Sequence, residues 1–393
     1  MTRLGFVTVA RSDYGIYLPL LRRAAQVPGL TWGLYVTGMH LSPASGMTVQ
    51  AIEADGFPIL DRVHMLMASD APEGITLSIG QGVEGFARSF ARHRPDLLVV
   101  LGDRFEMMAA ALAALPFLIP VAHIHGGEIT EGAMDDALRH AITKLSHLHF
   151  ASTEAHARRI RQLGEAPDRV WACGAPGLDH LLDLEWLPDG ELETRIGRPL
   201  VPGLLMATFH PVTLEQEATG AQVEAFLGAL HDAGRPVIFT LPNADTHGQQ
   251  VAGAIQAFLD THPDCRMAGN LGTRAYFSLM RRAGAMVGNS SSGLIEAASF
   301  QLPVVNVGNR QKGRTRGRNV IDVPATRGAI ADGIRRALDP AFQDSLAGMT
   351  NPYHLGEPAS RLILERLLAT DPASLIPKAF FDWPSAADPG RTP

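Results

Sequence analysis

The chain has 393 residues and a formal net charge of −6 at pH 7, with 46% hydrophobic and 19% charged residues. This composition is typical of a globular protein and lacks the positive charge that nucleic-acid binding requires, so we expect no nucleic-acid partner. The length predicts two domains, because a single hydrophobic core rarely extends beyond about 250–300 residues.

The cysteines and the apolar runs bear on location. Cys173 and Cys265 are the only cysteines and form no CxxC pair, so we expect neither a disulfide framework nor a thiolate metal site. The first residues lack the long apolar run and the cleavage site of a signal peptide, and no stretch of 18 apolar residues occurs. We therefore expect a cytoplasmic protein without a membrane partner.

Short apolar runs alternate with helix-length segments along the chain. Runs that are apolar throughout are typical of parallel strands covered by helices on both faces. In the first half they span residues 4–10, 31–38, 96–103, 119–125, 148–153 and 169–174, and in the second half 204–210, 236–242, 285–290, 303–308 and 320–323. The pattern predicts an α/β fold of two Rossmann-like, doubly wound domains that face a cleft.

The domain boundary is predicted within residues 181–203, which are rich in proline, glycine and charge and have no sustained period. This gives an N-terminal domain over 1–180 and a C-terminal domain over 200–350. Residues 356–371 carry leucine and isoleucine at helical spacing and predict a late helix within a C-terminal segment, 355–385.

Polar side chains follow nearly every predicted strand. Ligands of open parallel sheets bind beyond the carboxyl ends of the strands, so this concentration indicates an enzyme. The residues at these ends are Arg11, Asp13 and Tyr14; Asp103, Arg104 and Glu106; His123 to Glu128; His210; Asn243 and Asp245; and Asn289 to Gly293.

A phosphate site is predicted after the strand at 285–290. The turn GNSSSG and the predicted helix LIEAASF would present free N–H groups and a helix dipole to an anion. Ser290 could instead be only an N-cap, and Glu296 could contact ribose hydroxyls or simply face solvent. The arginine-rich loop 306–319 could neutralise a diphosphate or be an ordinary solvated loop. Neither a GxGxxG fingerprint nor a P-loop is present.

The segment HIHGGEITEGAMDD, residues 123–136, admits two kinds of chemistry. His123 and His125 have the spacing of a metal-binding pair, with His210 as the only well-placed further ligand. Alternatively, carboxylates could surround one substrate carbon and exchange its proton; these are Asp103, Glu128, Asp135 and Asp136. The two adjacent aspartates could also be acids that merely favour a helix N-terminus.

Eight ordered motifs resemble the UDP-N-acetylglucosamine 2-epimerases, specifically their hydrolysing branch in sialic-acid and related nonulosonate pathways. The motifs are ARSDYG, GDRFE, HIHGGE, DDALRHAITKLSHLHFAST, FHPVT, LPNAD and GNSSSGLIEA, followed by RQKGR. The resemblance implies a GT-B-like fold whose last helix returns to the first domain. It also implies loss of UDP and of the C2 proton to form a glycal, hydration to the 2-epimerised free sugar, and no cofactor.

The resemblance also implies roles for individual residues. Asp103 and Asp135 match acid–base positions, and His210 and Arg104 match positions near the diphosphate. The remaining matches are nucleotide or sugar contacts, namely Arg11, Asn243, Ser290, Ser291, Glu296 and Arg310. His125 stands where several relatives have a catalytic glutamate, so either His125 or Glu128 takes the proton-transfer role. Gly15 replaces a serine that touches the nucleotide in some relatives.

The expected substrate is UDP-N-acetylglucosamine, or UDP-2,4-diacetamido-2,4,6-trideoxyglucose of the legionaminic-acid pathway. A GT-B glycosyltransferase, a metal-dependent hydrolase built on His123 and His125, and an inactive nucleotide-sugar sensor are the alternatives. By resemblance, we expect a homodimer or homotetramer.

Overall fold

The protein is described here from a computed structural model that covers residues 2–69, 71–131, 134–211, 216–240, 248–269 and 271–382. The chain divides into two compact units. The first consists of Met1–Glu128, Asp135–Asp179 and Tyr353–Pro393, and the second of Ile129–Met134 and His180–Pro352. The short segment Ile129–Met134, expected in the N-terminal domain, therefore groups with the second unit.

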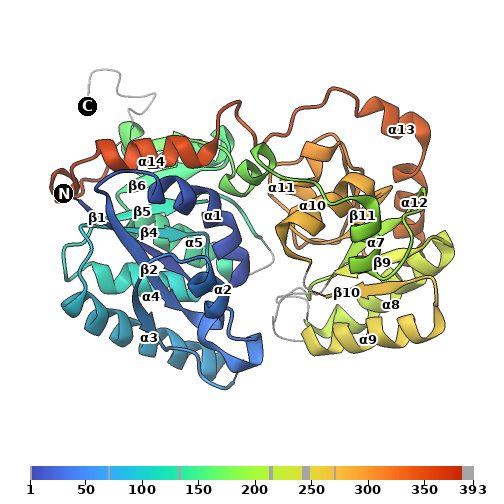
Figure 1. Ribbon diagram of the computed structural model, residues 1–393, viewed down its shortest axis with the longest axis horizontal. Coiled ribbons are helices and arrows are strands. Elements are labelled where there is room, and N and C mark those ends of the chain that lie inside the picture. Colours follow the sequence, from blue (N-terminus) through green and yellow to red (C-terminus); the bar gives the residue numbers. More distant parts are fainter. Residues whose placement is uncertain are drawn as a thin grey trace. The chain divides into compact units, whose positions relative to one another are not determined.

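The first unit contains a parallel sheet in the order β3-β2-β1-β4-β5-β6-β7, with helices on its faces (Figure 1). Its strands are β1 (Arg3–Thr8), β2 (Thr31–Thr37), β3 (Ile59–Val63), β4 (Leu97–Leu101), β5 (Val121–Ile124), β6 (Leu148–Ala151) and β7 (Val170–Ala172). Its helices are α1 (Arg11–Ala25), α2 (Val49–Ala54), α3 (Pro72–Arg92), α4 (Phe105–Ala114), α5 (Asp135–Leu145), α6 (Glu154–Gln162) and α14 (Ala359–Ala369). The strand order reverses between β1 and β4, which is where open α/β sheets place their ligands.

The second unit repeats this design with a parallel sheet in the order β10-β9-β8-β11-β12-β13. Its strands are β8 (Leu205–Thr208), β9 (Val237–Thr240), β10 (Arg266–Ala268), β11 (Ala285–Gly288), β12 (Val304–Val307) and β13 (Val320–Val323). Its helices are α7 (Asp189–Ile196), α8 (Thr219–Ala233), α9 (Gly248–Thr261), α10 (Gly272–Arg282), α11 (Ser292–Ile295), α12 (Arg327–Ala337) and α13 (Pro340–Ser345). Helix α7 lies in the segment that the sequence left without a regular element.

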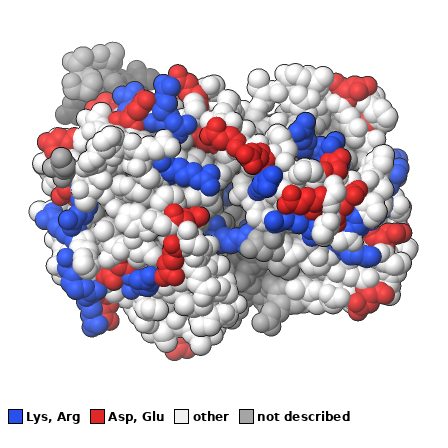
Figure 2. Space-filling view, viewed as in Figure 1, with Lys and Arg blue, Asp and Glu red and all other residues white. Residues whose placement is uncertain are grey.

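The central strands are buried along their whole length, as parallel strands between two layers of helices must be. Every residue of β4 and of β8 is buried. Among the described residues, no helix is both long enough and apolar enough to span a membrane. On the face shown in Figure 2, acidic and basic side chains are interspersed rather than segregated by sign.

The C-terminal segment is fastened to the first unit. Helix α14 packs against α1, and Asp179 accepts hydrogen bonds from the backbone N–H groups of Ala359 and Ser360 at the start of α14 (3.1 and 2.7 Å). Further along, Lys378 Nζ donates to the carbonyl oxygens of Lys144 and Ser146 (2.8 and 2.5 Å). These bonds occupy carbonyl groups at the C-terminal end of α5 and hold that helix.

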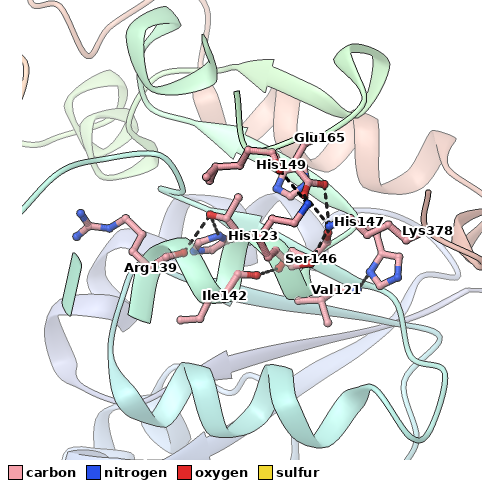
Figure 3. A network of polar contacts seen from close by, with 12 residues as sticks. Val121, His123, Arg139, Ile142, Ser146, His147, His149, Glu165 and Lys378 are labelled. Carbon is pink, nitrogen blue, oxygen red and sulfur yellow. Dashed lines mark hydrogen bonds and ion pairs between the residues drawn. The ribbon is translucent and has the colours of Figure 1, made fainter. Parts of the chain in front are cut away.

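Glu165 is the centre of the same charged network (Figure 3). Its carboxylate accepts from Lys144 Nζ (2.6 Å) and Lys378 Nζ (2.7 Å) and bonds His149 Nε2 (2.9 Å). These partners outweigh the opposing effect of burial and lower the pKa of Glu165 to about 2. Burial in turn lowers the pKa of Lys378. The favourable energy of the network is therefore partly cancelled by the cost of burying the ammonium group.

Candidate active site

Asp103 and Arg139 form an ion pair at the carboxyl end of β4. Asp103 follows β4 after Gly102, and Arg139 lies on α5. The Arg139 guanidinium donates to Asp103 Oδ2; the Arg139 side chain is 2% exposed and that of Asp103 is 21% exposed. The guanidinium favours the ionised form of Asp103 and fixes its direction. Asp103 is thus an oriented, partly accessible carboxylate.

His125 and Glu128 form an acid–base pair directly after β5, the strand next to β4. His125 Nδ1 lies 2.7 Å from Glu128 Oε1, and Ser152 Oγ at the end of β6 donates to the same oxygen over 2.6 Å. An ionised carboxylate can only accept, so Nδ1 carries a hydrogen and Nε2 is the ring nitrogen left to exchange a proton with a ligand. Nε2 is buried and has no hydrogen-bond partner within the described part of the chain.

The backbone of His125 is strained. Its φ of 62° lies in the left-handed region, which a histidine rarely adopts. The His125 N–H group donates to the carbonyl oxygen of Phe150 over 2.9 Å, which holds this conformation in place. Strain of this kind costs about 1–3 kcal/mol and concentrates at functional sites. It turns the imidazole out of the line of β5 and toward Glu128.

His123 has a structural role instead. Its side chain is fully buried, with Nε2 2.7 Å from the Gly102 carbonyl oxygen and Nδ1 3.1 Å from Thr143 Oγ1. Burial lowers the pKa of His123 to about 3, so the ring is neutral. Both ring nitrogens are occupied by protein groups, which argues against the metal-binding alternative for His123 and His125. The described residues contain no group of three or more side chains placed to hold a metal ion.

Arg104 is already paired within the first unit. Its Nε and Nη2 atoms donate to the two carboxylate oxygens of Glu106 over 3.2 and 3.1 Å, and Glu106 is fully buried. Because both partners are charged, Arg104 adds less net positive charge for a diphosphate than its residue type suggests. Arg11 is exposed in the first turn of α1.

Asp135 and Asp136 are half-buried in the first turn of α5, where the helix dipole favours negative charge. Asp136 Oδ2 lies 3.6 Å from His140 Nε2, one turn along the helix. The same helix carries Arg139 on its buried side, so α5 brings Asp135 and the partner of Asp103 into one rigid element.

In the second unit, Asn289 organises the ends of β8 and β11. Gly288 has a φ of 138°, and a Cβ atom there would lie 1.8 Å from the Thr208 carbonyl oxygen, so only glycine permits this approach. Asn289 Oδ1 then accepts from the His210 N–H group (2.7 Å), and Asn289 Nδ2 donates to the His210 carbonyl oxygen (2.8 Å). Burial and the nearby Arg310 hold the pKa of His210 well below its usual value, so its ring is neutral.

Arg310 and Gln311 both donate to the carbonyl oxygen of Asn289, over 3.0 and 2.9 Å. The start of the basic loop is therefore fixed beside His210. Farther along the loop, Arg314 donates to Thr130 Oγ1 (3.3 Å) and Lys312 pairs with Glu131 (2.9 Å). These contacts explain why Ile129–Met134 belongs to the second unit.

The predicted helix after GNSSSG is shorter than expected. Helix α11 covers only Ser292–Ile295, and a 3-10 turn over Ala297–Phe300 follows. Ser291 is its N-cap residue without a side-chain cap, while Ser290 Oγ accepts from the Ser292 N–H group (3.4 Å). A helix of one turn has a weak dipole, so anion binding here depends on individual N–H groups. Glu296 is half-buried at the end of α11.

The structure thus gathers Asp103, His125 and Glu128 on neighbouring strands, and His210 and Arg310 around Asn289. Asn243 lies outside the described residues. Glu106 and Asn289 were predicted at strand ends but given no role, whereas Ser152, which also lies at the end of a predicted strand, was not singled out. Arg139 lies on a helix and not after a strand, and its position four residues after Asp135, one helical turn along, was the only sequence feature that could have indicated a role in the site.

These features define a two-domain α/β enzyme of the GT-B-like class. Acid–base side chains lie at the carboxyl ends of the strands of one sheet, and the basic loop follows a strand of the other. The profile of the UDP-N-acetylglucosamine 2-epimerase family matches residues 22–367, and the chain belongs to this family. Its relatives place it in the hydrolysing branch.

Two relatives illustrate the match. The UDP-N,N'-diacetylbacillosamine 2-epimerase (hydrolyzing) of Legionella pneumophila is 39% identical over 334 residues, covering 85% of this chain and 88% of the relative. The polysialic acid biosynthesis protein P7 of Escherichia coli is 36% identical, covering 90% of each chain. The fold matches the crystal structure of UDP-GlcNAc 2-epimerase from Neisseria meningitidis bound to UDP-GlcNAc, with a TM-score of 0.80, 19% identity, and coverage of 94% of this chain and 100% of that one.

Proposed function

We propose that this chain hydrolyses a UDP-2-acetamido sugar with inversion at C2, releasing UDP and the manno-configured free sugar for nonulosonate biosynthesis. The observation that carries the proposal is the His125–Glu128 hydrogen bond of 2.7 Å at the strained end of β5. It gives an imidazole backed by a carboxylate, in a chain whose relatives are hydrolysing 2-epimerases.

The first step is an elimination. A base takes the C2 proton, the electron pair of the C2–H bond becomes the C1=C2 double bond, and the C1–O bond breaks, its electrons leaving with UDP. We assign the base to His125 Nε2, because Glu128 stabilises the imidazolium that forms. Arg310 and Arg11 offset the charge of the diphosphate, and His210 and Arg104 lie near it. The remaining residues contact the nucleotide or sugar, namely Ser290, Ser291, Glu296 and Asn243.

The second step is hydration of the resulting glycal. Water adds its oxygen to C1, and a proton returns to C2 from the opposite face, which inverts the configuration there. We assign Asp103 and Asp135 to this side of the reaction. Asp103 is held by Arg139 in a fixed direction, as a group that orients water must be.

We propose UDP-2,4-diacetamido-2,4,6-trideoxyglucose as the substrate and UDP-N-acetylglucosamine as the second candidate. The relative from Legionella pneumophila and a 35% identical relative from Campylobacter jejuni both carry diacetylbacillosamine in their names, which supports this order. We further propose action in the cytoplasm as a homodimer or homotetramer; the free, buried thiols of Cys173 and Cys265 suit a reducing compartment.

The test is to incubate each UDP-sugar with the purified protein, without any acceptor and with and without a chelator. We expect UDP release that survives chelation and is faster with the diacetamido sugar. Release that depends on an acceptor would instead indicate a glycosyltransferase, and loss with chelator a metal-dependent hydrolase. Binding of UDP without turnover of either sugar would indicate a sensor.

A further inference from the structure

Asp13 is a carboxylate of the first unit to which the proposed reaction gives no role. It lies in the first turn of α1, at the carboxyl end of β1 and beside the point where the strand order reverses. Its Oδ2 atom is buried and has no hydrogen-bond partner in the described ranges. A buried carboxylate oxygen without a donor is costly when ionised, so this position favours a group that carries a proton.

The charges that act on Asp13 come from the start of α4, where Arg104 is the N-cap residue and Glu106 lies in the first turn. Arg104 attracts its negative charge, and Glu106 repels it. The Arg104 guanidinium, however, already donates hydrogen bonds from Nε and Nη2 to the two carboxylate oxygens of Glu106. One cation therefore faces two carboxyl groups, and the three together are neutral only when one proton is present.

Arg11, two positions earlier in α1, is exposed to solvent, and two other titratable groups near Asp13, His40 and Tyr17, are neutral. His40 bonds Thr8 Oγ1 (2.9 Å) and Thr48 Oγ1 (2.8 Å), and burial lowers its pKa to about 4, so it is neutral. Tyr17, one turn along α1, is buried, and its pKa is raised well above the usual value. Burial is the largest influence on Asp13 itself and, with Glu106, raises its pKa to about 6 despite Arg104.

We propose that Asp13 is a positioning residue of the nucleotide-sugar site that takes up a proton when the UDP group binds. The proposal rests on the proposed function, in which Arg104 and Arg11 lie near the diphosphate. A dianionic ligand there disfavours the ionised form of Asp13 further, so the Asp13 carboxyl group becomes protonated. The group formed by Asp13, Glu106 and Arg104 is then neutral and no longer repels the ligand.

Proton uptake by Asp13 makes UDP binding depend on pH. Because the bound state holds the proton more tightly than the free state, UDP binds most tightly below about pH 6, and the affinity falls as the pH rises through the higher pKa of the complex. A carboxylate that only caps α1 through the backbone of Ala10 would show no such coupling.

Calorimetric titration with UDP in buffers of different ionisation enthalpy measures the protons taken up per site. UDP itself titrates near neutral pH, so the informative quantity is the difference between proteins. At pH 7 we expect the unmodified protein to take up about half a proton more than Asp13→Asn, which mimics the neutral acid and should therefore bind UDP more tightly than the unmodified protein at this pH. Asp55→Asn is the matched control, because Asp55 is an exposed acid that bonds the neighbouring Tyr14 (2.5 Å), and we expect its uptake to be unchanged.

Equal proton uptake by the unmodified protein and Asp13→Asn would overturn the proposal while leaving the proposed function intact. Absence of UDP binding by the unmodified protein would remove the proposed function and this inference with it. If Asp13→Asn does not fold, Glu106→Gln serves instead. It removes the like charge, so the pH of maximal uptake should move down, and an unmoved maximum would contradict the proposal.

Discussion

Replacing Glu128 by glutamine tests the acid–base pair most sharply, because the amide keeps the shape of the side chain and removes its charge. The carboxylate accepts from His125 Nδ1 (2.7 Å) and Ser152 Oγ (2.6 Å). When His125 takes the C2 proton, the bond to Glu128 becomes a bond between two charged groups, worth about 1.5–3 kcal/mol. Since about 1.4 kcal/mol corresponds to a tenfold change in rate, we expect kcat to fall by about 10- to 150-fold.

The assay is continuous UDP release, with thermal unfolding and UDP binding as folding controls. Ser152→Ala is the matched control: it removes the other bond to the same oxygen and keeps the charge, so its loss should stay below about tenfold. An unchanged kcat in Glu128→Gln would refute the reasoning, as would a Ser152→Ala variant that is equally impaired.

Comparison of His125→Gln with Glu128→Gln shows which of the two residues is the base. If His125 transfers the proton, His125→Gln should lose about 10²- to 10⁴-fold, more than Glu128→Gln. The reverse order would assign proton transfer to Glu128, with His125 orienting it.

Two further predictions concern ion pairs. Asp103→Asn should abolish formation of the manno-configured free sugar and keep UDP binding, while lowering the free energy of unfolding by about 2–4 kcal/mol because Arg139, 2% exposed, loses its charged partner; a variant with normal turnover would show that Asp103 has no part in the chemistry. The lowered pKa of Glu165 means that its contribution to stability is present above about pH 4.5 and is lost as the pH falls toward about 2. Denaturant unfolding at pH 7 should show Glu165→Gln less stable than the unmodified protein by about 1–3 kcal/mol. The partial exposure of Lys144 and the cost of burying Lys378 keep this difference small. The difference should shrink at pH 3. A difference that does not change with pH would contradict the assignment of the shift to Glu165.

The interior of both sheets could be predicted from the sequence, because a strand buried on both faces is apolar at every position. Two of the four edge strands, β3 and β10, could not. In β3, ILDRV, only the last residue is buried, and β10, RMA, begins with an exposed arginine. A strand at the edge of a sheet has one neighbour and keeps polar side chains in solvent, so it lacks the continuous apolar signal.

The positions of the site residues could also be predicted, because polar side chains follow the carboxyl ends of parallel strands. Their partners could not, since pairing depends on how distant segments pack. Arg139 meets Asp103 across 36 residues, and Ser152 meets Glu128 across 24. His123 and His125 look alike in sequence and, two positions apart, would lie on the same face of a strand. His123 lies within β5 and is buried against Gly102 and Thr143, whereas His125 lies just beyond β5, where its left-handed backbone turns the ring toward Glu128.

The most direct measurement is the isotope content of the sugar released in deuterated water. A base that removes the C2 proton and an acid that returns a solvent-derived proton predict one deuterium at C2 in every product molecule, in the manno configuration, with UDP formed in equal amount. Product that retains the original hydrogen at C2 would mean that the C2–H bond never breaks, and the account of His125, Glu128 and Asp103 would fail.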